Sequence, residues 1–215
     1  MNRKVLFLAL PVLLILSTSI VFVVSAIALG NYASYLIGIS FYWFFWCLCV
    51  PTLIGRKSIL DFMRSEKPFL TGRNWWVILL FLSTVIVPLF MYNTIQKVMV
   101  TPLYLILLNI LLATINGCCE EVFWRGFFVK EFPDSIVWGI VIPSIFFALW
   151  HFAPQFAIPH DNRVAFVLST LPLGIINGLV AYKTRSAKWS AIGHSIGGVL
   201  AVAGPPAISL YNLLG

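Results

Sequence analysis

Residues 103–125 have the sequence LYLILLNILLATINGCCEEVFWR, and this stretch decides both the fold and where to look for function. Its first seventeen residues, from Leu103 to Cys119, carry no charge, which is typical of a helix that crosses a membrane. Two adjacent carboxylates, Glu120 and Glu121, then follow, and Arg125 comes four residues after the second. Ionisable groups at membrane depth are costly to bury, so they are candidates for a functional site.

The spacing of these three charges gives the two carboxylates different expected roles. On a helix each residue turns by about 100°, so Glu121 and Arg125 lie on one face and can form an ion pair. Glu120 points about 100° away from Glu121 and is left free for chemistry. The plainer interpretation is a helix end at the lipid headgroups, with two solvated glutamates and an anchoring arginine.

The composition of the chain is that of a polytopic membrane protein. Of its 215 residues, 60% are hydrophobic and 10% are charged, whereas a soluble domain carries about 25% charged residues. We therefore expect an all-α transmembrane bundle of about seven spans, some broken or re-entrant. The bundle should be a single membrane-embedded domain, residues 1–215, with a motif-bearing core at about 103–200. The four cysteines lie inside apolar runs, where packing as small hydrophobic residues is the default.

The expected spans follow the apolar runs at 5–29, 36–54, 75–92, 103–130, 144–156, 164–182 and 189–203. Pro143 is expected to break the fifth run, which makes 135–142 a separate, shallow segment. The polar stretch 55–74 contains apolar residues that predict an interfacial turn of helix. Residues 207–214 form an apolar tail that is too short to span alone.

The positive charges predict the orientation of the bundle. The chain has fourteen Lys and Arg residues and a net charge of +7, and we place twelve of these residues on one side of the expected spans. This bias predicts a cytoplasmic N-terminus, and with the compact loops it indicates a bacterial or archaeal plasma membrane. The charges lie in short clusters between apolar runs and are not interleaved with aromatic residues in a polar segment, so we expect no nucleic-acid partner.

Two histidines in late apolar runs add to the glutamate pair. They are His151, in the pattern Phe147-x-x-x-His151, and His194. A carboxylate and an imidazole can share one water, which the carboxylate deprotonates, while a second imidazole donates to the oxyanion. Alternatively, a glutamate and both histidines bind a zinc ion. We expect no cofactor, because the sequence lacks a metal-ligand spacing, and zinc is the alternative.

Plainer interpretations exist for the other candidates. A single histidine in a transmembrane helix is often a hydrogen-bonded packing residue, and His160 lies in a polar loop where it is expected to be solvated. Cys119 adjoins Glu120 and is a possible nucleophile, but its apolar neighbours keep the thiol protonated.

The three motifs in this order resemble those of the CPBP family, the CAAX prenyl protease 2-like and bacteriocin-processing intramembrane glutamic proteases, also called the Abi family. The similar stretch is roughly 103–200, and the first hundred residues match only as apolar spans. The resemblance implies that Glu120 activates water together with His151 and that His194 helps to form the oxyanion hole. It implies a peptide, or a lipid-modified or membrane protein, as substrate among membrane lipids.

One position departs from the family pattern. In that family an asparagine commonly follows the late histidine by four residues, and here that position is Gly198. Either another donor, such as Ser195, Asn177 or a backbone amide, replaces it, or activity is weakened. The expected function is an intramembrane endopeptidase that cuts near the membrane face. The alternative is a weak or inactive member that acts as a scaffold or a peptide-immunity protein. A transporter or proton relay is disfavoured, because the two halves lack paired broken helices.

Overall fold

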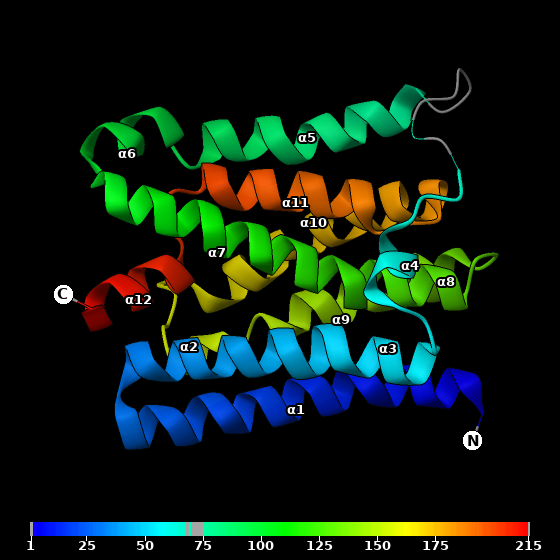
Figure 1. The fold of residues 1–215 in the computed structure, drawn as a ribbon, viewed down its shortest axis with the longest axis horizontal. Coiled ribbons are helices and arrows are strands. Elements are labelled where there is room, and N and C mark those ends of the chain that lie inside the picture. Colours follow the sequence, from blue (N-terminus) through cyan, green and yellow to red (C-terminus); the bar gives the residue numbers. More distant parts are fainter. Residues whose placement is uncertain (1, 68, 70–74, 215) are drawn as a thin grey trace.

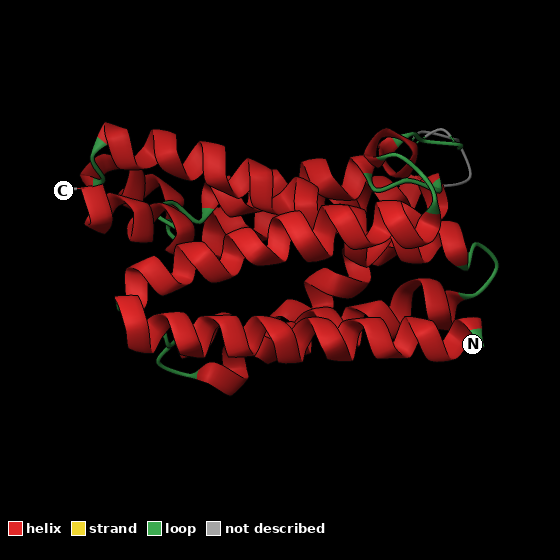
Figure 2. Cartoon of the chain, turned by 60° about the horizontal axis from the view of Figure 1, so that its bottom comes forward, coloured by secondary structure: helices red, strands yellow, loops and turns green. Residues whose placement is uncertain are grey.

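A computed structural model of the chain describes residues 2–67, 69 and 75–214 as one bundle of helices (Figure 1). The longer helices run along a common axis, and the part of the chain that the model describes contains helices and loops but no strand (Figure 2). The N-terminus lies at one end of this axis and the C-terminal helix at the other (Figure 1).

Five helical stretches are long and apolar enough to cross a membrane. They are α1 (Arg3–Leu29); α2 (Asn31–Phe41) continued by η1 (Tyr42–Cys49) and α3 (Val50–Gly55); α7 (Leu103–Glu121) continued by η2 (Val122–Phe127) and α8 (Phe128–Glu131); η3 (Val137–Val141) with α9 (Ile142–Trp150) and η4 (Pro154–Phe156); and α10 (Arg163–Thr184).

Two further pairs of helices are bent. α5 (Trp75–Met91) meets α6 (Thr94–Val100) at 56°, and α11 (Lys188–Leu200) meets α12 (Pro205–Leu214) at 53°. If each pair counts as one broken span, the total is seven. The chain is therefore a multi-pass, all-α membrane protein with some broken spans, as the sequence predicted.

The break after α11 exposes backbone groups that no helical partner satisfies, and side chains from two other helices bind them. Asn109 on α7 donates to the carbonyl of Val199 at 3.0 Å and accepts from the amide of Gly204 at 2.9 Å. Thr94 and Lys97 on α6 donate to the next two carbonyls along α11, at 2.6 and 3.2 Å. Such pairing is what a non-helical segment within an apolar bundle requires.

The expected break at Pro143 is wrong. Residues 137–141 form a π-helical turn that continues directly into α9, and Pro143 lies in the first turn of α9. Within this continuous helix Pro143 lacks an N–H and its ring crowds the carbonyl of the preceding turn, and the wider π-helical turn accommodates both. Residues 135–142 therefore do not form a separate shallow segment, since most of them belong to the span from 137 to 156.

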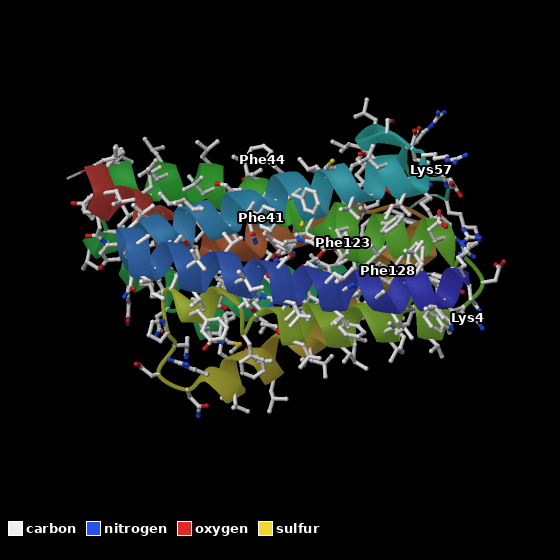
Figure 3. All side chains as sticks on the ribbon, turned by 90° about the horizontal axis from the view of Figure 1, so that it is seen from below. Lys4, Phe41, Phe44, Lys57, Phe123 and Phe128 are labelled. Atoms are coloured by element: carbon white, nitrogen blue, oxygen red, sulfur yellow. The ribbon has the colours of Figure 1, made fainter. Side chains whose placement is uncertain are left out.

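Charged residues gather at the end of the bundle where the N-terminus lies. Figure 3 shows Lys4 and Lys57 at this end. Ion pairs join the segments that meet here, namely Arg3 with Glu131, Lys130 with Glu66, and Arg185 with Asp134. The hydrogen bond from Lys130 holds the pKa of Glu66 below its ordinary value. Arg73 lies outside the described residues, and the membrane side that this end faces stays a prediction.

The interfacial turn expected in the 55–74 stretch is the short helix α4 (Ile59–Met63). A capping box begins it, because the Ser58 side chain accepts from the Asp61 amide and the Asp61 side chain accepts from the Ser58 amide. Its Phe62 is fully buried and packs against Phe127 of η2. Helix α4 therefore packs against η2, the segment that follows the glutamate pair.

Close backbone contacts hold α11 between α5 and α7. A Cβ atom added at Gly117 of α7 would lie 2.7 Å from the backbone nitrogen of Ser195, and one added at Gly197 would lie 2.9 Å from the carbonyl oxygen of Thr84. Glycines permit this close approach of helices in membrane bundles. Because His194 precedes Ser195, the contact at Gly117 sets where His194 lies relative to the end of α7.

Gly117→Ala is expected to destabilise the protein by roughly 1–3 kcal/mol, because α7 and α11 must separate to admit the methyl group. The measurement is the thermal unfolding midpoint of the purified protein in detergent. Gly198→Ala is the matched control, since its Cβ would meet only the Ala113 side chain, at 3.2 Å. Equal midpoints for the two variants would contradict this description of the α7–α11 contact.

Candidate active site

The glutamate pair lies at the end of α7 and is fully enclosed by the bundle. Glu120 is 1% exposed and Glu121 is 0% exposed. The π-helical segment η2 begins at the next residue, and such segments often occur at functional sites. The interpretation of two solvated glutamates at the headgroups is therefore wrong.

His194 on α11 contacts both glutamates. Its Nε2 lies 3.4 Å from Oε2 of Glu120, and its Nδ1 lies 3.0 Å from Oε1 of Glu121. An ionised carboxylate only accepts hydrogen bonds, so both ring nitrogens donate when His194 is an imidazolium. With Arg125 as the second cation, two carboxylates and two cations then sum to zero charge, which is the balance that burial favours.

Glu121 accepts hydrogen bonds at Oε1 and forms an ion pair, without a hydrogen bond from the described residues, at Oε2. The i,i+4 ion pair expected from the sequence is present, with Nε of Arg125 3.5 Å from Oε2 of Glu121. Asn177 on α10 donates from Nδ2 to the other oxygen, Oε1, at 3.3 Å. The guanidinium of Arg125 is 0% exposed and lies 4.5 Å from the ring centroid of Phe147. Glu121 therefore contacts Arg125, Asn177 and His194 at once.

His151 belongs to the same region but does not contact either glutamate through a hydrogen bond or an ion pair. The ring of Phe147 packs edge-to-face against both imidazoles, with centroid separations of 4.7 Å to His151 and 6.0 Å to His194. Nδ1 of His151 lies 2.8 Å from the carbonyl oxygen of Phe147. This bond requires a proton on Nδ1, so Nε2 of a neutral His151 is left as an acceptor.

The other sequence candidates lie outside the contacts of the glutamates. The hydroxyl of Ser195 donates to the carbonyl of Thr114 on α7 at 3.3 Å. Gly198 faces Ala113 of α7, because a Cβ added at Gly198 would lie 3.2 Å from the Cβ of Ala113. His160 is exposed and stacks on Phe166, with centroids 4.9 Å apart. Of the donors considered as replacements for the missing asparagine, Asn177 alone contacts a glutamate.

An aromatic wall near the site had no signal in the sequence. Trp43 donates from its indole nitrogen to Asn116, which lies one turn before Glu120 on α7, at 2.8 Å. Tyr42 accepts from the indole of Trp124 at 2.6 Å and stacks on Trp150. The only usable clue was the density of Tyr, Phe and Trp residues in the second span, which is equally typical of ordinary core packing.

Among the residues that the structure describes, no three His, Cys, Asp or Glu side chains converge in a group that could hold a metal ion. The zinc alternative requires Glu120, His151 and His194 to act as ligands of one ion. Zinc therefore stays the alternative prediction.

Comparison with known proteins gives one match. Residues 101–200 match the model of a family described as type II CAAX prenyl endopeptidase Rce1-like. No curated protein and no solved structure matches the chain significantly. The matched segment contains the glutamate pair, both membrane histidines and Asn177. Residues 101–200 are therefore similar to the Rce1-like type II CAAX prenyl endopeptidases, and this match supports the resemblance of the motifs to the CPBP family of intramembrane proteases.

Proposed function

We propose that the protein is an intramembrane endopeptidase that hydrolyses a peptide bond near the membrane face, with Glu120 as the general base. The observation that supports this most is the unequal environment of the two Glu120 oxygens. Oε2 faces His194, whereas Oε1 is buried and has no hydrogen-bond partner among the described residues. A buried acceptor without a partner costs free energy, and a hydrogen bond from a water molecule would satisfy this oxygen.

In the proposed reaction one water donates to Oε1 of Glu120 and to the free Nε2 of His151. Glu120 takes a proton from this water as the water oxygen attacks the carbonyl carbon of the substrate. The carbonyl oxygen becomes an oxyanion and accepts a hydrogen bond from Nε2–H of His194. Glu120 then gives its proton to the amide nitrogen as the C–N bond breaks, which leaves a carboxylic acid and an amine, and the acid passes its proton to the amine to give a carboxylate and an ammonium group.

The contacts of His194 support the role of oxyanion donor. Its Nδ1 donates to Glu121, which fixes the ring, and Nε2 also carries a proton when His194 is an imidazolium. This is the arrangement by which a buried carboxylate orients the histidine of serine proteases. The imidazole must release Oε2 of Glu120 to reach the oxyanion, so the interaction becomes strongest in the transition state.

The enclosed position of the site supports a substrate that reaches it from the membrane. The outer faces of the surrounding helices carry many exposed apolar side chains that suit contact with lipid. We therefore propose a peptide, or a lipid-modified or membrane protein, as substrate, and hydrolysis without a metal cofactor. The proposed location is the plasma membrane of a bacterium or archaeon, with the N-terminus in the cytoplasm.

A second candidate is a weak or inactive member that binds a partner. Gly198 favours it, since no side chain at this position reaches toward the oxyanion and Ala113 of α7 occupies the adjacent space. His194 is then the side-chain donor that we assign to the oxyanion. Catalysis with one oxyanion donor is slower than with two, because losing one donor lowers kcat by about 10²–10³-fold.

Glu120→Gln is expected to abolish cleavage while the folded yield stays at the wild-type level, because the change keeps size and polarity but removes the base. Glu121→Gln is the matched control at the adjacent position. It should lower the folded yield, because it removes the charge that Arg125 pairs with, and breaking a buried ion pair costs roughly 3–5 kcal/mol. Cleavage of a membrane-peptide library and gel filtration in detergent measure the two effects. The reverse pattern would show that the two carboxylates are assigned wrongly.

His194→Ala is expected to reduce kcat by about 10²–10³ with little change in KM, since the lost hydrogen bond acts in the transition state. Gly198→Asn should lower the unfolding midpoint and not raise kcat, because the new side chain must displace Ala113. Steady-state kinetics on any cleaved peptide and thermal unfolding check both. A gain in kcat for Gly198→Asn would mean that an asparagine reaches the oxyanion after all.

Hydrolysis is expected to continue at an unchanged rate in the presence of a strong chelator, because Glu120 and an imidazole can activate water without a metal. The measurement is the initial cleavage rate with and without chelator, with Glu120→Gln as the blank. Complete loss of the rate, restored by added zinc, would move the assignment to a metalloprotease.

A further inference from the structure

Asn177 is a buried polar residue whose role the motifs do not explain. It lies in the middle of α10 and is 1% exposed. Burying an amide costs free energy unless it is hydrogen-bonded. Gly174 and Gly178, which lie one turn apart on α10, let this helix lie close to Ser144 and Ile140, since an added Cβ would meet these at 3.2 and 2.8 Å. This close packing places the amide of Asn177 among the charged groups of the site.

The chemistry of Glu121 fixes the orientation of this amide. A carboxylate only accepts, so the NH₂ group of Asn177 must face it, and Nδ2 lies 3.3 Å from Oε1. The same oxygen accepts from Nδ1 of His194 at 3.0 Å. The amide oxygen of Asn177, on the opposite side, is buried and has no hydrogen-bond partner within the part of the chain that the structure describes. Asn177 and His194 are therefore coupled through one shared acceptor atom.

We infer that Asn177 is a positioning residue that orients His194 through Glu121. Arg125 alone holds Oε2 of Glu121 at a long 3.5 Å and leaves the carboxylate free to rotate about its last bond. The donation from Asn177 removes this freedom, because it fixes the second oxygen from another helix. The shared oxygen then directs Nδ1 of His194, and the opposite ring nitrogen faces Glu120.

The absence of a side chain at Gly198 makes this positioning more important. A single side-chain donor to an oxyanion contributes only when it is held in the productive direction, and a displacement of about 1 Å can cost 10²-fold in rate. The expected loss in rate rests on the proposed protease function, whereas the expected change in orientation of the His194 ring does not. Asn177 therefore orients His194, the donor that is present. It does not itself take the place of the asparagine that is missing at position 198.

A positioning role can be separated from a structural one with Asn177→Leu. Leucine has a similar volume and removes both the bonded amide nitrogen and the unpartnered amide oxygen, so the cost in stability should be small. Asn177→Asp should be worse for the site, because it places a second carboxylate against Glu121. Thr170→Val on the same helix is the matched control, since the Thr170 hydroxyl is buried and bonds only to the carbonyl of Val167 in its own helix.

The first readout is the ¹⁵N resonances of the histidine rings in labelled protein, which has only three histidines. In Asn177→Leu the ring signals of His194 should shift or broaden, while those of His151 and His160 stay unchanged, and Thr170→Val should leave all three unchanged. His194→Ala identifies the signals of His194. Unchanged His194 signals in Asn177→Leu would overturn the inference, whether or not the protein is a protease.

The second readout is kinetic. Asn177→Leu should lower kcat by about 10- to 100-fold with KM nearly unchanged. In the His194→Ala background the same substitution should cause no further loss, because two residues that act through one group are not additive. An equal loss in both backgrounds would show that Asn177 does not act through His194. If the wild type cleaves no peptide, the proposed function fails, and the ring resonances still decide the role of Asn177.

Discussion

The placement of His194 between two buried carboxylates is the interaction on which the rest of the structure depends. Glu120, Glu121 and Arg125 are buried and the His194 side chain is 12% exposed, and none of these charges is stable there alone, because an isolated buried charge is costly. Together they form a neutral group when the imidazole is protonated. The surrounding helices must therefore hold the end of α7 and the middle of α11 in one fixed relation.

Close contacts at glycines, and hydrogen bonds to the backbone at the bent end of α11, hold α7 and α11 in this position. Gly117 allows α7 to touch the backbone of α11, and Gly197 does the same toward α5. The bent end of α11 is bound by Asn109, Thr94 and Lys97, so that the break in the helix leaves its backbone paired. A site assembled from four helices in this way is rigid where the imidazole meets the carboxylates, which is what oxyanion stabilisation requires.

Local features of this protein could be predicted from its sequence, whereas features that depend on helix packing could not. The Glu121–Arg125 pair follows from residues four apart on one helix, and the spans follow from long apolar runs. The contact of His194 with both glutamates, and the absence of one between His151 and Glu120, depend on the relative depth of helices that are distant in sequence. The break expected at Pro143 is absent because a π-helical turn, which has no simple sequence signal, precedes this residue.

A structure with a bound analogue of the tetrahedral intermediate, such as a peptide phosphonate, tests the central claim most directly. The account predicts that one anionic oxygen of the analogue accepts from Nε2 of His194, that a second faces Oε1 of Glu120, and that Nδ1 of His194 stays on Glu121. An analogue whose oxygens are held by His151, while His194 keeps its contact with Glu120, would contradict the roles assigned to the two histidines.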